Sequence, residues 1–252
     1  MNKKLIATIL FTGTLFTATL SNIGFNSIVK AEETNLSPKE QIEQNKIIEQ
    51  SKKDAEKIIK NWDKIKVMPA KEYEQRKIEK EKALEDAGIE QPKERQKRSA
   101  NTIYPQYVGQ TGDILVTPES VSGYINGNGS LTGHAGMINL WHKYTTESFP
   151  DGGVQRRNND WKTRYKKFIC GEPKGVPVGP GLAAARYAES HQGFGYNWNF
   201  ANKTTTDRFY CSQLVWRAWY NQGYDLDVNG GLVVSPADIM ASPKLNVFYK
   251  QG

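Results

Sequence analysis

Residues 133–149 read GHAGMINLWHKYTTESF. The apolar stretch at 134–141 predicts a largely buried β-strand, and a second strand is expected at 144–149, where the two would pair as a hairpin. Strands that are joined by a hairpin run antiparallel. This stretch therefore predicts a mainly antiparallel sheet.

The segments on either side of the hairpin add further strands and helices. Short apolar runs predict strands at 112–116 and around 168–170. Apolar residues at helical spacings predict helices at 180–191 and 211–219. Residues 101–252 are therefore expected to form one α+β domain, in which an antiparallel sheet packs against helices.

The chain begins with the features of a secretory signal peptide. Lys3 and Lys4 precede an apolar stretch at 5–20, and Ala31 ends a segment with small residues at the usual cleavage positions. The alternative is an N-terminal membrane anchor, but the threonines within the apolar stretch favour cleavage. Residues 1–31 are therefore expected to be removed, which leaves a secreted, extracellular protein with no membrane span.

Residues 32–100 are expected to form a charged helical arm. Nearly half of them are charged, and they include a single Trp and no Cys or Phe, so they make a poor core. A capping box at Ser37 predicts the start of an amphipathic helix, which Pro69 is expected to interrupt. A second helix is expected at 70–87, and an exposed linker is expected at 91–98. Two interpretations stay open: a removable pro-segment that covers a site, or a solvated spacer or partner-binding helix.

Composition excludes several classes of protein. The net charge is +7, but the basic residues are not clustered in the way expected of a dedicated DNA-binding protein, so no nucleic acid partner is expected. Two cysteines in 252 residues exclude a disulfide scaffold and a tetrathiolate zinc site. The glycine-rich loop at 123–133 lacks the ending of a phosphate-binding loop. No metal or cofactor is implied, and the oligomeric state is left open.

The candidate chemistry is that of a cysteine nucleophile. Cys211 opens a predicted helix, whose first-turn amides and positive dipole end favour a thiolate. His134 begins the first strand of the hairpin and Glu147 lies on the second, so the hairpin could bring an imidazole base and an orienting carboxylate together. Asp151 is the spare candidate for the carboxylate.

The remaining cysteine and histidines are assigned structural roles. Cys170 is expected to fill the core, although a disulfide between Cys170 and Cys211 stays open as an alternative. His191 lies in the last turn of a predicted helix, where an imidazole can cap it. His142 lies eight residues beyond His134, too far along an extended strand for the same site.

Five segments in a fixed order resemble a known family. They are GDILVT at 112–117, GHAGMI at 133–138, TTESFPDGGVQ at 145–155, GFGYNW at 193–198 and YCSQLVWRAWYNQG at 210–223. Together they resemble the circularly permuted NlpC-type, papain-like cysteine hydrolases of the YiiX/YaeF group. The resemblance spans nearly all of residues 101–252 and does not cover the helical arm.

The resemblance implies a permuted papain-like fold and a catalytic triad. In the permuted group the chain order is His, polar residue, Cys, which is the order of His134, Glu147 and Cys211. Carried over, Cys211 is the nucleophile, His134 the base and acid, and Glu147 the group that orients the imidazole.

The resemblance also implies a reaction and a class of substrate. The expected activity is hydrolysis of an amide bond through a Cys acyl-enzyme, and the expected substrate is a cell-wall peptide or a related amide. Two alternatives stay open: a lipid or N-acyl amidase or acyltransferase with the same triad, and a catalytically silent surface-binding module. Candidates for lining the substrate cleft are Tyr196, Trp198 and Tyr210.

Overall fold

The computed structural model describes residues 36–91, 107–120 and 131–252. The signal peptide expected at 1–31 lies outside the described residues. Of the linker expected at 91–98, only residue 91 is described. Leu36–Gly252 form one compact unit. Within the described ranges no helix combines the length and the apolar character that crossing a membrane requires.

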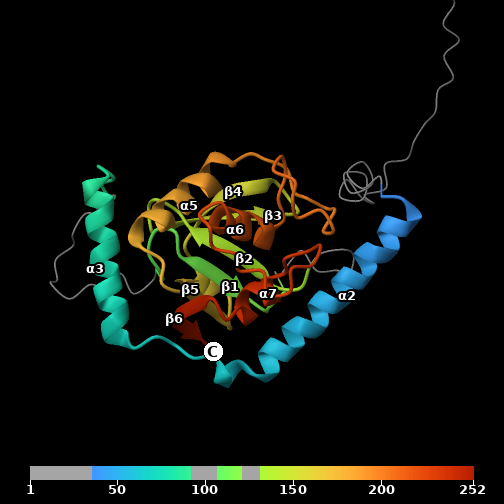
Figure 1. Cartoon of the computed structure of the whole chain (residues 1–252), viewed down its shortest axis with the longest axis horizontal. Helices are drawn as coiled ribbons and strands as arrows, with labels where there is room; N and C mark the ends of the chain where they lie inside the picture. Colours follow the sequence, from blue (N-terminus) through green and yellow to red (C-terminus); the bar gives the residue numbers. More distant parts are fainter. Residues whose placement is uncertain (1–35, 92–106, 121–130) are drawn as a thin grey trace, which may run out of the picture. The chain divides into compact units, whose positions relative to one another are not determined.

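Six strands form a single sheet in the order β4-β3-β2-β1-β5-β6, and every neighbouring pair is antiparallel (Figure 1). The predicted antiparallel sheet and α+β class are therefore confirmed. The strands are β1 (Ile114–Thr117), β2 (His134–Ile138), β3 (Tyr144–Phe149), β4 (Gly153–Asn158), β5 (Phe168–Pro173) and β6 (Leu245–Gln251).

The expected hairpin is the pair β2 and β3, but β2 is shorter than predicted. It ends at Ile138 because the next residues form a turn. In this turn the backbone N–H of Asn139 donates to the carbonyl of Tyr144 over 3.0 Å, and the N–H of Tyr144 donates to the carbonyl of Trp141 over 2.8 Å. Trp141 therefore lies in the turn rather than in the strand.

The two edge strands, β4 and β6, were not predicted. The last residues of β4 are polar and exposed, and β6 pairs with β5 across a register shift between Cys170 and Gly171. Edge strands have one neighbour and often one solvent-facing side, so their sequences show less of the apolar pattern that indicates a strand.

Three helices of the domain pack on the sheet: α5 (Val178–Ser190), α6 (Cys211–Tyr220) and α7 (Pro236–Ala241) (Figure 1). α5 and α6 contact β2 and β3, and α7 contacts β1 and β6. Alternate residues of β1 belong to two different clusters of buried side chains, so the sheet buries both of its faces. A fourth, single-turn helix, α4 (Trp161–Arg164), connects β4 to β5.

The arm consists of α2 (Pro38–Lys60), a 3-10 turn (Trp62–Lys64) and α3 (Ala70–Asp86). The capping box at Ser37 and a left-handed Gly88 after the second helix are present as expected. The first helix was expected to run to Pro69, but it ends at Lys60, and Pro69 instead precedes α3 as its N-cap. α2 packs against α7 and α3 packs against α5. The main partners of the two helices are thus elements of the domain.

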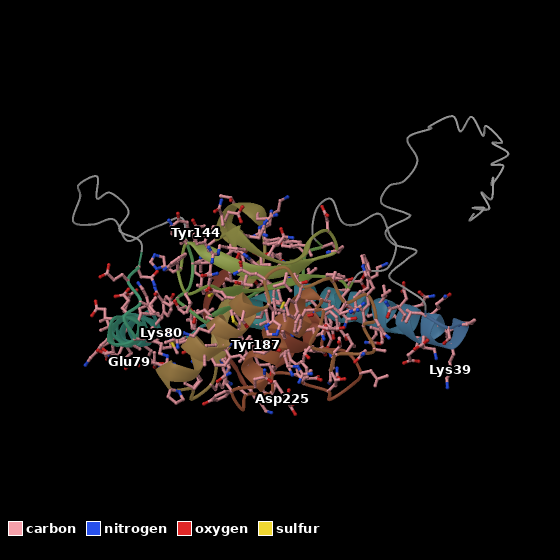
Figure 2. The ribbon with its side chains drawn as sticks, turned by 90° about the horizontal axis from the view of Figure 1, so that it is seen from above. Lys39, Glu79, Lys80, Tyr144, Tyr187 and Asp225 are labelled. Carbon is pink, nitrogen blue, oxygen red and sulfur yellow. The ribbon has the colours of Figure 1, made fainter. Side chains whose placement is uncertain are left out.

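α3 places a lysine in the protein interior. Lys80, labelled in Figure 2, is only 3% exposed. Its ammonium contacts the carboxylate of Asp113 and lies 2.7 Å from a carboxylate oxygen of Glu172, which also accepts hydrogen bonds from Arg76. Asp113 and Glu172 are themselves buried, so this ion cluster joins the arm to the sheet.

Candidate active site

The β2–β3 hairpin brings His134 and Glu147 together. Gly136 pairs with Glu147 in the ladder, so His134, two residues earlier, is a diagonal neighbour of Glu147 on the same face. Nε2 of His134 lies 2.7 Å from Oε2 of Glu147, and both side chains are buried. The carboxylate therefore holds the imidazole by one nitrogen and leaves Nδ1 for another partner.

Cys211 supplies the second partner of the imidazole. It is the first residue of α6, and this helix packs against β2 and β3. Its thiol forms a hydrogen bond with His134 and accepts hydrogen bonds from the backbone amides of Ala135 and Ser212. The structure thus joins the three residues singled out in the sequence into one chain of contacts, from Cys211 through His134 to Glu147.

The environment shifts the pKa values of both members of the thiol–imidazole pair. Burial is the largest single influence and works against charge on both groups, but their mutual hydrogen bond and the other neighbouring charges and donors together outweigh it. Together with the Ala135 and Ser212 amides, His134 lowers the pKa of the Cys211 thiol, and Cys211 and Glu147 raise the pKa of His134 to about 9. A thiolate–imidazolium pair is the arrangement that these shifts favour.

Several groups besides His134 hold the Glu147 carboxylate. The Arg164 guanidinium donates to both carboxylate oxygens over 2.8 and 2.9 Å, and the indole of Trp161 donates over 3.1 Å. Thr145 Oγ1 donates to it as well. Although burial raises the pKa of Glu147, the His134 hydrogen bond and the charge of Arg164 bring it well below its usual range. Glu147 therefore stays ionised.

Trp161 and Arg164 are site residues that no sequence pattern indicates. They lie three residues apart, and α4 is a single turn that no periodic pattern reveals. The available signal was chemical, because a carboxylate expected in a buried strand needs a cation, and Arg164 is a nearby candidate in the sequence. Trp161 also stacks on the His134 ring, with centroids 5.8 Å apart, while Phe149 stacks at 4.5 Å. These aromatic rings fix the plane of the imidazole.

Gly136 provides the space that Glu147 occupies. A Cβ atom added at this position would lie 2.7 Å from Cγ of Glu147 and 3.2 Å from the Trp161 ring. We expect Gly136→Ala to destabilise the protein by about 1–3 kcal/mol, since neither neighbour can move freely, and to slow alkylation of Cys211. Urea unfolding and iodoacetamide labelling measure the two effects.

The matched control for this substitution is Gly179→Ala, at the start of α5, where an added Cβ meets nothing within 4 Å. It should leave both measurements unchanged or raise stability slightly. Equal effects of the two substitutions would contradict the assigned role of Gly136.

The other candidates lie apart from this chain of contacts. Asp151 is exposed in the turn between β3 and β4, which leaves Glu147 as the carboxylate beside His134. Cys170 and Cys211 are both free thiols, and burial raises the pKa of Cys170 well above its usual value. His191 follows α5, and its Nδ1 lies 2.7 Å from the carbonyl of Tyr187, as a capping role predicts.

The three cleft candidates differ in their environment. Tyr210 is fully buried, and its hydroxyl accepts a hydrogen bond from the backbone N–H of Val234 over 3.1 Å. Tyr196 is 6% exposed, and its pKa is raised by burial and by the nearby charge of Cys211. Trp198 is partly buried, and its ring centroid lies 4.8 Å from that of Tyr196. Tyr196 and Trp198 thus form an aromatic pair on the loop that precedes α6.

Comparisons with known proteins add a distant homologue. The chain is 33% identical over 144 residues to YycO, an uncharacterized protein of Bacillus subtilis (strain 168). The match covers 54% of this chain and 58% of YycO, less than two thirds of the relative's length. No family model matches the chain. Among the described residues, no three His, Cys, Asp or Glu side chains are grouped to hold a metal ion.

Proposed function

We propose that this protein is a secreted cysteine hydrolase that cleaves an amide bond through an acyl-enzyme. One observation carries the proposal: a thiol at the first residue of a helix shares a hydrogen bond with an imidazole that a buried, ionised carboxylate orients. A core cysteine without a catalytic task has a raised pKa, as Cys170 has, whereas the pKa of Cys211 is lowered.

The geometry supports a two-step reaction. The Cys211 thiolate attacks the carbonyl carbon and forms a tetrahedral intermediate, whose oxygen the first-turn N–H of Cys211 can stabilise. His134 donates its proton to the leaving amine as the C–N bond breaks, which leaves a thioester. His134 then takes a proton from water, and the resulting hydroxide attacks the thioester, so the C–S bond breaks, the acid is released and the Cys211 thiolate is regenerated beside the protonated His134.

Glu147 acts on this reaction through His134. The carboxylate is saturated by donors from Arg164, Trp161 and Thr145, so it keeps its charge while the imidazole gains and loses a proton. Its role is to fix the ring and stabilise the imidazolium.

The fold family and the substrate class rest on the resemblance. The order His134, Glu147, Cys211 and the antiparallel sheet support a circularly permuted papain-like fold of the YiiX/YaeF type. The resemblance to NlpC-type enzymes supports cell-wall peptide amides as substrates, and the segment at 1–31 supports secretion. A secreted enzyme with such substrates would act at the cell wall.

The direct test is hydrolysis by the Cys211→Ala variant. We expect the release of new amino groups from a soluble muropeptide mixture to fall by at least about a thousandfold, because the variant lacks the thiol that forms the acyl-enzyme. Cys170→Ala is the matched control, since it removes the other thiol. Its folded fraction should hydrolyse the mixture at the rate of the unsubstituted protein. Unchanged hydrolysis in Cys211→Ala would overturn the proposal.

The same assay separates the substrate classes. Release of free fatty acid from N-acyl amino acids, without release from muropeptides, would replace the cell-wall assignment by the lipid amide alternative. Absence of both activities, together with a Cys211 that iodoacetamide does not label at neutral pH, would favour a silent binding module.

A further inference from the structure

α2 contains a buried glutamine that makes two hydrogen bonds to one loop of the domain. The side-chain amide of Gln44 donates to the carbonyl of Trp198, and its oxygen accepts from the backbone N–H of Phe200 over 3.0 Å. Gln44 is 8% exposed, and Phe200 is fully buried. One side chain therefore satisfies both a donor and an acceptor of the loop, as a paired strand would.

A second polar side chain on the same face of α2 reaches another segment. Ser51 lies seven residues beyond Gln44, two helical turns along, and its hydroxyl accepts from the backbone N–H of Thr132 over 3.1 Å. Ser51 is buried, and Thr132 lies two residues before His134. The buried stripe of α2 thus contacts the entrance of β2 as well as the loop.

These two segments flank the candidate active site. The loop held by Gln44 carries Tyr196, which lies close enough to Cys211 for the thiolate charge to add to burial in raising the pKa of its phenol, and Trp198, which packs against Tyr196. The segment held by Ser51 leads directly into His134. α2 therefore contacts a neighbour of each reacting group, one on the thiol side and one on the imidazole side.

α2 is also fixed to the domain at its end. Trp62, just after the helix, is 3% exposed, and its indole N–H donates to the carbonyl of Gly252. The ammonium of Lys250 donates to the Trp62 carbonyl over 3.3 Å. Both contacts are to β6 or the residue after it, so the helix is secured independently of its contacts near the site.

We infer that α2 positions the walls of the active site, with Gln44 and Ser51 as positioning residues, and that the arm is a permanent part of the working enzyme. The inference rests on the proposed function for the identity of the site. Removal of the arm would break both hydrogen bonds of Gln44 to the loop, and it would expose the apolar side chains of the domain that share a buried cluster with Ile47 and Trp62. These contacts do not fit a segment that is discarded on activation.

The test compares Gln44→Ala with Gln50→Ala on the same helix, where Gln50 is exposed and bonds only to Asp54 among the described residues. Hydrogen exchange of the amides at 197–202 is measured in the intact protein, together with kcat and KM for muropeptides. We expect Gln44→Ala to speed exchange of the loop by roughly tenfold and to raise KM several-fold while kcat changes little. Gln50→Ala should change none of these values.

A further variant separates positioning from general destabilisation. Gln44→Glu keeps an acceptor for the Phe200 N–H but sets a carboxylate oxygen against the Trp198 carbonyl, so its loop should exchange at least as fast as that of Gln44→Ala. A merely structural role for Gln44 would lower the melting temperature and kcat with an unchanged KM.

Unchanged exchange at 197–202 in Gln44→Ala, or an equal change in Gln50→Ala, would overturn the inference. Absence of hydrolysis in the unsubstituted protein would overturn the proposed function instead, and the exchange result would still decide whether α2 holds the loop. The two failures are therefore distinguishable.

Discussion

His134→Ala is expected to abolish the enhanced reactivity of the Cys211 thiol. In the unsubstituted protein His134 lowers the pKa of Cys211 against the effect of burial, and only the backbone amides of Ala135 and Ser212 would remain to oppose burial in the variant. Since each unit of pKa changes the thiolate fraction tenfold at pH values below the pKa, alkylation at pH 7 should slow by at least about tenfold. The midpoint of the pH–rate profile should move upward.

The measurement is the rate of iodoacetamide labelling of Cys211 between pH 5 and 10, followed by mass spectrometry of the peptide. Cys170 serves as the internal control, because burial raises its pKa in both proteins and it should label slowly throughout. A Cys211 profile that is identical in the two proteins would show that the imidazole does not activate the thiol, and the enzymatic interpretation would then lose its main support.

The fold class and the three central residues could be predicted from the sequence because local patterns encode them. The β2–β3 hairpin is a pair of neighbouring segments, and α6 has apolar residues at helical spacing directly after Cys211. A short hairpin fixes which residues meet across it, so the approach of His134 and Glu147 follows from local pairing.

The contacts that the sequence did not reveal join elements that no local pattern pairs. Arg164 reaches Glu147 from a single-turn helix, and Gln44 reaches Phe200 across 156 residues. An arm that is nearly half charged looks solvated, because composition does not show that a few of its polar side chains face inward. Lys80 is such a residue, since a lysine is almost never fully buried unless it is paired. Its partners are Asp113, just before β1, and Glu172 on β5.

Lys80→Met is expected to cost about 3–5 kcal/mol of stability at pH 7, because it removes one partner of a buried ion cluster and leaves Asp113 and Glu172 close together. Methionine has nearly the same length, so the loss of charge dominates over the loss of packing. The matched control is Lys77→Met, one turn earlier on α3, where the partner Glu74 is largely exposed. That substitution should cost at most about 1 kcal/mol in urea unfolding.

The pH dependence of this loss identifies its cause. Burial raises the pKa of Asp113 to about 7 even with Lys80 beside it, so between its ordinary value of 3.8 and pH 7 the folded state binds more protons than the unfolded state. The resulting stability is present at low pH and is lost as the pH rises through this window. Without Lys80 the pKa of Asp113 rises further, so the pH range over which stability is lost extends upward. The variant therefore loses more stability at pH 8 than at pH 4. An equal loss at both pH values, or an equal cost of Lys77→Met, would show that Lys80 contributes packing rather than charge, and that α3 is not joined to the sheet by the ion cluster.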